Sequence, residues 1–461
     1  MQQKLFLGID ASKGYADFVI LDAAKQTVVP NFQLDDTIAG HHKLYQLLEH
    51  CLKHHRHCML FAGIESTGGY ENNWFNSLLG FSHSLNIKAA RLNPCGVSAF
   101  SKAELTRMTT DPISARAVAQ YLIAHGDKVS FSHQDLTAGM RRRWNLIKML
   151  TKQNTQLINH LQMLMYTAHP QLMVYCKDEI PNWVFELLKR YPTCARLSRA
   201  TTKALAQIPY ITKQRATQLI ADAKVSVGSA VDSDTEQVIK MTVQQIVHLK
   251  KAIAVQKDQL NQQCLTREVE LLKSFAGIST YSAVGLMIEI QTITRFVSAK
   301  KLACFFGLHP VFKSSGDHVG RMRMSKKGRK QPRCILYMVA RSAIVCNPLI
   351  RSIYQRHVQK GMAKMAAIGV CMHKICRIIY GMLKHQKPFD PAVDEQNRQK
   401  TKKASQASDT AAANKNRRYQ PLDPKAPVSK RQAQKRRGNE NLSQDDHVIV
   451  CGINQPVASM T

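Results

Sequence analysis

The chain begins with short apolar runs divided by turn residues, a pattern that favours strands over helices. These runs occupy residues 5–10, 16–21, 28–32, 58–64 and 87–92. The close spacing of the first three predicts an antiparallel meander. Helical stretches, expected at residues 42–52 and 70–79, separate the later runs. Three strands followed by alternating helix and strand predict an α/β domain over residues 1–132.

Beyond residue 135 the pattern changes to long polar helices, expected at residues 136–166 and 236–273. Apolar residues in the second helix keep spacings of three, four and seven, at Ile246, Leu249, Ile253 and Leu260. Such a seam is typical of a coiled coil, but two amphipathic helices packed on a core would also produce it. Residues 133–270 are therefore expected to form a helical or coiled-coil segment, with a small apolar unit inserted at residues 183–223.

Residues 271–390 again have the composition of a globular domain. Helical periodicity at residues 302–306, 335–345 and 366–382 predicts that this domain is mostly α-helical. From residue 391 to 461 the composition changes to Lys, Arg, Gln, Asn, Ala and Ser, which cannot bury a core. We expect a disordered basic tail there. Its cationic clusters could screen phosphates independently of sequence, or the tail could be solvated with no dedicated role.

The charge balance of the chain indicates a polyanionic partner. Sixty-five Lys and Arg stand against 32 Asp and Glu, giving a net charge of +33 that attracts nucleic acid. An apolar content of 44% argues against a mere basic coat protein. No run approaches the ~18 apolar residues of a membrane span, and the first residues lack a signal-peptide pattern, so a cytoplasmic, nucleoid-associated protein is expected. The twelve cysteines lack zinc-site spacing and are expected to be buried, reduced thiols.

Three carboxylates lie where the predicted elements begin or end. Asp10 ends the first apolar run, Glu65 ends the fourth, and Asp111 opens a helix-like stretch in which Pro112 suits the first turn. Converging carboxylates repel one another unless cations are present, so this set predicts a Mg²⁺ or Mn²⁺ site able to act on phosphodiesters. A single acid at a strand end is more often a turn or cap residue. The combination with the strand order indicates the metal site.

A faint internal echo links residues 208–212, Ile-Pro-Tyr-Ile-Thr, with residues 275–279, Phe-Ala-Gly-Ile-Ser. Both are similar to the hairpin of a helix-hairpin-helix module, whose backbone amides can bind a phosphate. Each lacks one of the usual glycines of that hairpin, so the signal is weak.

Four segments of the first domain resemble one known family. They are Leu7-Gly8-Ile9-Asp10, Ile64-Glu65-Ser66-Thr67-Gly68, Leu92-Asn93-Pro94 and Thr110-Asp111-Pro112. The family is the DEDD transposases, which include Piv-like DNA invertases and the bridge-RNA-guided recombinases of insertion sequences. The resemblance implies a RuvC-like, RNase H-like domain in which four acids hold divalent metal, with Asp10, Glu65 and Asp111 as the first three.

The fourth acid of that family would fall on Ser114. A spacing of three places Asp111 and Ser114 on one helical face, so a hydroxyl or a bridging water could approach the metal with one negative charge fewer. Weaker metal affinity, or a degenerate site, would follow.

The region of residues 271–390 resembles the C-terminal transposase domain of the same family. The matching segments include Gly307-Leu308-His309-Pro310, Ser315-Gly316 and Met324-Ser325-Lys326-Lys327-Gly328. The resemblance implies that Ser315 is the nucleophile, with Ser314 as a one-residue alternative. A serine hydroxyl needs a base or a field that stabilises developing charge. Cationic residues follow closely and indicate phosphate contact, with a solvated basic face as the alternative: Arg321, Arg323, Lys326, Lys327, Arg329, Lys330 and Arg333.

These observations predict a transposase or site-specific recombinase that cleaves and rejoins DNA through a serine–phosphate intermediate with divalent metal. The resemblance further implies a bridge RNA that selects the DNA sites. Acids and serine on separate domains would favour a homo-oligomer, a dimer or a tetramer. Two alternatives stay open: a RuvC-like metal-dependent nuclease that leaves Ser315 structural, and a catalytically degenerate nucleic-acid-binding remnant.

Overall fold

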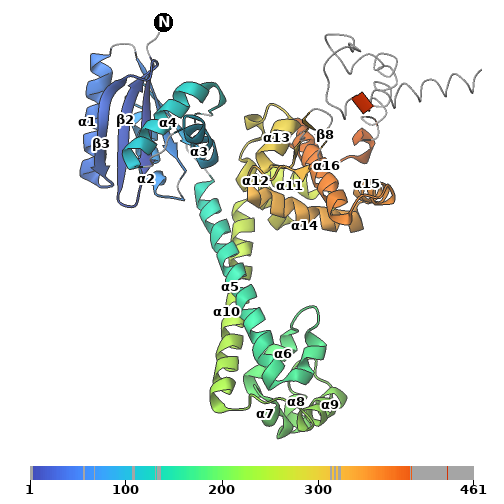
Figure 1. Ribbon diagram of the computed structural model, residues 1–461. Coiled ribbons are helices and arrows are strands. Elements are labelled where there is room, and N and C mark those ends of the chain that lie inside the picture. The colour runs from blue at the N-terminus through green and yellow to red at the C-terminus, as the bar shows by residue number, and fades with distance from the viewer. Residues whose placement is uncertain are drawn as a thin grey trace, which may run out of the picture. The chain divides into compact units, whose positions relative to one another are not determined.

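The computed structural model describes two compact units, residues 1–138 and 139–461 (Figure 1). Within them the described residues are 4–55, 58–66, 68–105, 110–129, 131, 137–311, 314–315, 318–319, 323–394, 396 and 433–434. Of residues 314, 315, 318 and 319 the structure describes only the backbone. The predicted tail therefore lies outside the described residues, apart from 391–394, 396 and 433–434.

The first unit is a five-stranded sheet between two pairs of helices. Its elements are β1 (Lys4–Ala11), β2 (Tyr15–Asp22), β3 (Thr27–Asp35), α1 (Ile38–His54), β4 (Met59–Glu65), α2 (Glu71–Phe81), β5 (Ile87–Leu92), α3 (Pro94–Ala103), α4 (Asp111–His125) and η1 (Gly126–Lys128). The strand order is β3-β2-β1-β4-β5, antiparallel among the first three strands and parallel from β1 to β5. The predicted meander and the alternation that follows it are confirmed.

Successive residues of each strand place their side chains on opposite faces of this sheet. Leu7, Ile9 and Phe18 pack with residues of α1 and α2, whereas Val19 and Leu21 pack with Ala115 and Ala119 of α4. Because side chains alternate along a strand, Gly8 and Asp10 of β1 lie on the α4 face. The edge strand β3 carries Pro30, which an inner strand would not tolerate.

The second unit is helical and contains two hydrophobic cores. Its elements are α5 (Ala138–Ala168), η2 (Pro170–Cys176), α6 (Asn182–Arg190), α7 (Cys194–Ser198), α8 (Thr202–Leu205), α9 (Lys213–Lys224), α10 (Ser233–Gln263), α11 (Arg267–Lys273), α12 (Thr280–Ile290), η3 (Ile293–Arg295), α13 (Ala299–Phe306), β6 (Pro310–Val311), β7 (Ser314–Ser315), β8 (His318–Val319), β9 (Arg323–Met324), α14 (Lys330–Cys346), α15 (Pro348–Gln359) and α16 (Lys364–His385). The mostly helical character of the region that follows the first domain is confirmed.

The long helices α5 and α10 each contribute to both cores. Trp144 of α5 and Leu260 of α10 pack with the helices from α11 to α16, whereas Leu161 of α5 and Ile246 of α10 pack with the inserted helices α6 to α9. The apolar spacing in α10 thus serves packing on two cores, as one of the two interpretations expected. The coiled coil stays a prediction.

Two expectations, one about a helix of this unit and one about the cysteines of the whole chain, are wrong in detail. The helix predicted at residues 236–273 ends at Gln263, and a new helix begins after Thr266, whose hydroxyl accepts a hydrogen bond from the amide of Val269. The helix α15 was not predicted. Among the described cysteines, which are all free, four are exposed rather than buried: Cys95, Cys304, Cys334 and Cys346.

The two echoed segments adopt the same turn. Tyr210 and Gly277, at equivalent positions, both have a positive φ, of 70° and 113°. In each turn the next residue donates its amide to a carbonyl three positions earlier, at 3.1 Å for Ile211 and 3.0 Å for Ile278. The echo is therefore a structural repeat.

The helix α16 is long and apolar enough to cross a membrane, judged by length and composition alone. One face of α16, with Cys371, Ile375, Ile379 and Leu383, is buried in the core that the helices from α11 to α16 form. It is the central helix of that core.

Candidate functional site

The ends of two neighbouring strands bring Asp10 and Glu65 together. The pair Ile9 and Ile64, opposite each other in the parallel register of β1 and β4, directly precedes both acids. Ile64 faces α1 and α2, so Glu65 lies on the α4 face, as Asp10 does. Asp111 is the first residue of α4, which packs on that face. The three acids predicted from the sequence thus lie on one side of the sheet.

Two glycines determine how closely α4 approaches the strands. A Cβ atom added at Gly8 would lie 2.0 Å from the carbonyl oxygen of Ala115, and one added at Gly63 would lie 2.6 Å from a methyl carbon of Leu122. Gly8 and Gly63 are each two residues before an acid of the set. The absence of side chains at these positions therefore sets the distance between Asp111 and the acids of the strands.

Gly8→Ala will push α4 away from the sheet, because a backbone oxygen blocks the added methyl group. We expect a loss of about 1–3 kcal/mol in the free energy of unfolding, measured by urea denaturation, and weaker binding of divalent metal. Gly80→Ala, where an added Cβ meets nothing within 4 Å, is the matched control and should not lower stability. Equal stability of the two variants would contradict this account of the packing.

Burial and nearby negative charge disfavour the charged forms of Asp10 and Glu65. The pKa of Asp10 is raised by burial first, then by the charges of Asp111 and Asp17, while a hydrogen bond from the Ser114 side chain opposes the shift. The pKa of Glu65 is raised by burial and by the charge of Asp10. In the part of the chain that the structure describes, carboxylates that repel one another are therefore gathered here, which is the electrostatic condition that a bound cation relieves.

Asp17 is a fourth carboxylate of this cluster, and the sequence interpretation missed it. It lies directly opposite Asp10 in the antiparallel register of β1 and β2, and only 4% of its surface is exposed. Gln33 donates a hydrogen bond of 3.2 Å to its Oδ2. Burial raises its pKa, and the charge of Asp111 adds to that shift. The hairpin turn centred between residues 13 and 14 was the available signal, because it pairs position 10 with position 17.

Two side chains with hydroxyl groups connect the acids. Ser114, at the position of the missing fourth acid, hydrogen-bonds to Asp10 through its side chain. The hydroxyl of Tyr15 donates to Oδ2 of Asp111 at 3.0 Å. Thr110 occupies the cap position of α4 but makes no side-chain cap bond. The start of α4 is therefore held against β1 and β2 by polar contacts.

The donor set of this cluster fits a hard cation. Carboxylate and hydroxyl oxygens are the ligands that Mg²⁺ and Mn²⁺ prefer. Among the described residues, no three acidic, histidine or cysteine side chains already converge at metal-ligand distances. Repulsion between uncompensated carboxylates favours such separated rotamers. Asp10, Glu65, Asp111 and Asp17 are the side chains that would hold the ion.

Ser114→Asp will tighten Mg²⁺ binding, because it adds a carboxylate at a position that already contacts Asp10. Isothermal titration with MgCl₂ measures the change, and we expect roughly a tenfold lower Kd, the equivalent of about 1.4 kcal/mol. Ser101→Asp, on α3, is the control for added charge and should leave the Kd unchanged. A weaker or unaltered Kd in Ser114→Asp would remove Ser114 from the surroundings of the metal.

The candidate nucleophile lies beside the tip of a β-hairpin. Pro310 pairs with Met324 and Val311 with Arg323 near the root, and Ser314 pairs with Val319 and Ser315 with His318 near the tip. Two residues separate Ser315 from its partner. The side chain of Ser315 lies outside the description, so the structure gives the backbone position of this residue.

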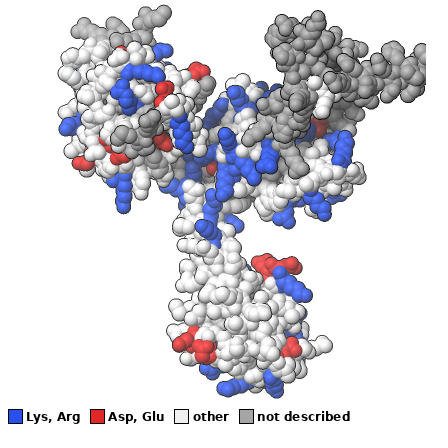
Figure 2. All heavy atoms as spheres, in the orientation of Figure 1, with Lys and Arg blue, Asp and Glu red and all other residues white. Residues whose placement is uncertain are grey.

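The cations predicted to bind phosphate fall into two groups. Arg329 and Arg333 have protein partners: Arg329 pairs with Glu289, and Arg333 donates to the carbonyl of Phe306 at 2.9 Å. Arg323, Lys326, Lys327 and Lys330 are exposed. Arg321 lies outside the described residues. Figure 2 shows lysine and arginine side chains gathered over the part of the second unit that carries α11 to α16.

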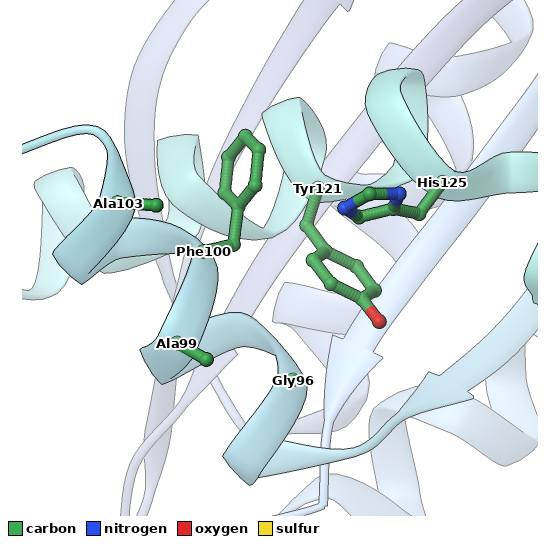
Figure 3. A pocket seen from close by; sticks show the side chains of 6 residues that line it. All are labelled: Gly96, Ala99, Phe100, Ala103, Tyr121 and His125. Atoms are coloured by element: carbon green, nitrogen blue, oxygen red, sulfur yellow. The ribbon is translucent and has the colours of Figure 1, made fainter. Parts of the chain in front are cut away.

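A hollow of about 350 Å³ lies between α3 and α4, away from the acids (Figure 3). Its lining residues are Gly96, Ala99, Phe100, Ala103, Tyr121 and His125. The ring of Tyr121 stands 5.0 Å from that of His125, at the opposite end of α4 from Asp111. A Cβ atom at Gly96 would lie 2.8 Å from the Tyr121 hydroxyl, so Gly96 gives this ring room against α3.

Sequence models of known families match both parts of the chain that carry these candidate residues. A transposase model of the DEDD group of IS110 matches residues 7–166, and the model described as the transposase IS116/IS110/IS902 family matches residues 269–355. Together they span more than half of the 461 residues. The chain belongs to the IS110/IS116 transposase family. Asp10, Glu65 and Asp111 lie in the first match, and Ser315 lies in the second.

Curated members of this transposase family show similarity at low identity. The chain is 29% identical over 136 residues to the pilin gene-inverting protein of Moraxella bovis, covering 28% of this chain and 41% of that protein. It is 23% identical over 247 residues to an IS110 protein of 43.6 kDa from Streptomyces coelicolor, covering 51% and 60%. It is 22% identical over 405 residues to an IS116 protein of 44.8 kDa from Streptomyces clavuligerus, covering 84% and 97%. The first two matches thus span less than two thirds of those relatives.

Proposed function

We propose that this transposase-family chain is a DNA recombinase that cleaves and rejoins strands through a covalent serine–phosphate intermediate. The oxygen of Ser315 attacks a DNA phosphorus, the bond to the leaving DNA oxygen breaks, and that oxygen takes a proton to become a free hydroxyl. Attack by a DNA hydroxyl on the phosphoserine then rejoins the strand and returns the serine. The observation that carries the proposal is that one transposase-family chain contains both an acidic cluster and a serine hairpin.

The acidic cluster supports a role for divalent metal. The strand order β3-β2-β1-β4-β5, with acids on the face that α4 covers, agrees with an RNase H-like or RuvC-like domain. A Mg²⁺ or Mn²⁺ ion, when bound, would neutralise phosphate charge and align the reacting oxygens. The protein's part is to hold Asp10, Glu65, Asp111 and Asp17 at one place on the sheet.

The exposed cations near the hairpin support phosphate binding. Arg323, Lys326, Lys327 and Lys330 follow the serine in sequence and have no acidic partner among the described side chains. Positive groups so placed would recruit a phosphodiester and stabilise the added charge of the pentacovalent state.

The acids and the serine belong to separate units of the chain. In our proposal a composite site draws its acids from one subunit and its serine from another, an arrangement that requires at least a dimer. The family resemblance also extends to a bridge RNA that selects the DNA sites, and the net charge of +33 suits RNA as well as DNA.

The name of the similar pilin gene-inverting protein supports inversion or transposition as the outcome of strand exchange. A metal nuclease is the second candidate, favoured by the four carboxylates of the first unit acting without the serine. Labelled DNA distinguishes the two, because a serine recombinase carries the label through denaturing electrophoresis and a nuclease releases free ends.

A further inference from the structure

The root of the serine hairpin is tied to the end of α13 by backbone contacts. The amide of Ser325 donates to the carbonyl of His309 at 2.9 Å, that of Lys326 donates to Gly307 at 3.1 Å, and that of Arg329 donates to Phe305 at 2.8 Å. The two glycines at this root touch, since a Cβ atom at Gly328 would lie 2.6 Å from the amide nitrogen of Gly307. Any displacement of this root is transmitted to the hairpin strands that begin at Pro310 and end at Met324.

A buried acid reaches this root from another helix. Glu289 lies in the last turn of α12, with 6% of its side chain exposed, and its Oε2 accepts a hydrogen bond of 2.8 Å from Nε of Arg329. The neighbours of Glu289 on α12 are almost all buried apolar residues. Arg329 is the residue at which the hairpin chain enters α14, and 48% of its side chain is exposed.

Glu289 is a poor choice for helix stability. A carboxylate at a helix C-terminus faces the negative end of the helix dipole. Burying an ion pair also costs desolvation, and apolar residues of similar volume are often at least as stabilising. The ion pair that Glu289 makes is with Arg329, which lies at the hairpin root. Glu289 therefore acts on the position of that root.

We propose that Glu289 is a positioning residue for strand cleavage: through Arg329 it fixes the root of the hairpin and thereby the place of Ser315. The inference rests on the proposed role of Ser315 as nucleophile. The inference gives Arg329 a different role from the neighbouring cations, because Nε of its guanidinium donates to Glu289. Displacement of a reacting atom by about 1 Å can cost roughly 100-fold in rate, so a modest shift of the root is enough to matter.

The inserted helices supply a matched control. Glu236, 8% exposed, accepts a hydrogen bond of 2.8 Å from Nε of Arg196, whose side chain is 59% exposed. This pair joins the same two groups at nearly the same burial as Glu289 with Arg329, and Glu236 also accepts a hydrogen bond of 3.2 Å from the Thr193 hydroxyl. It lies in the other core of the second unit, with the inserted helices, and α10 carries its acid in the first turn.

The test compares Glu289→Gln with Glu236→Gln in the full-length protein. Three quantities are measured for each: the melting temperature, the Kd for DNA, and the single-turnover rate of covalent adduct formation at saturating DNA and a temperature where both variants are folded. We expect Glu289→Gln to slow adduct formation roughly 10- to 100-fold with little change in Kd. Glu236→Gln should lower the melting temperature at least as much and leave the rate unchanged. Glu289→Asp, which keeps the charge, should recover part of the rate.

The outcomes separate the inference from the proposed function. Absence of an adduct in the unmodified protein would overturn the serine mechanism and the inference with it. A normal adduct rate in Glu289→Gln, or equal slowing in both Gln variants, would overturn the positioning role while leaving Ser315 as nucleophile.

Discussion

Replacing Ser315 with alanine will abolish the covalent protein–DNA complex and strand exchange together. The substitution removes only the side-chain hydroxyl group. DNA binding through the surrounding cations should therefore remain within about twofold, while the cleavage rate should fall by ~1,000-fold or more. The measurement is a reaction with labelled DNA, denatured in progress and resolved by electrophoresis. A retained covalent band in Ser315→Ala would remove Ser315 from the mechanism.

The neighbouring serine is the control for this substitution. Ser314 pairs with Val319 and Ser315 with His318, so the two serines occupy consecutive positions on one strand of the hairpin. Ser314→Ala should retain most of the activity. Peptide mapping of the adduct determines the attachment site independently, because attachment at Ser314 or at any tyrosine would contradict the assignment even if the family membership stands.

Much of the first unit was predictable because its elements obey simple periods. The central strands are buried on both faces and appear as continuous apolar runs, and the acids that end β1 and β4 interrupt those runs. A spacing of three on a helix predicted that Ser114 shares a face with Asp111, and the Ser114 side chain hydrogen-bonds to Asp10.

The features that were missed depend on strand register, side-chain pairing and helix capping, which apolar periodicity does not show. Asp17 follows a short polar turn and precedes an apolar run, so no local pattern distinguishes it from an ordinary strand residue; the register of β1 and β2 does. Arg329 resembles its neighbouring cations in sequence, and only the packing of α12 against the hairpin root pairs it with Glu289. The helix break before Thr266 is marked by the N-cap of α11. The long apolar period of the sequence does not show this break.

Asp10→Asn will abolish strand exchange while making the metal-free first unit more stable. Asp10 has a folded-state pKa above its ordinary value, because of burial and then of the charges of Asp111 and Asp17. A raised carboxyl pKa means that stability is fully present below the unfolded pKa and is lost as pH rises through the folded pKa. At neutral pH the charged group therefore opposes folding, and its neutral amide should raise the melting temperature in the presence of EDTA.

The response to metal should change in the opposite direction. In the unmodified protein Mg²⁺ should raise the melting temperature, because the ion binds the folded acids and not the unfolded chain. In Asp10→Asn this increase should disappear and recombination should fall by ~1,000-fold or more, while DNA binding is retained. Asp17→Asn should weaken the Mg²⁺ response too if its carboxylate belongs to the same cluster, whereas Asp35→Asn, on the exposed edge strand β3, should leave it intact. A full Mg²⁺ response in Asp10→Asn would exclude the acidic cluster as the metal site, and absence of any response in the unmodified protein would favour the degenerate remnant, because Ser114 would then have failed to replace the fourth acid.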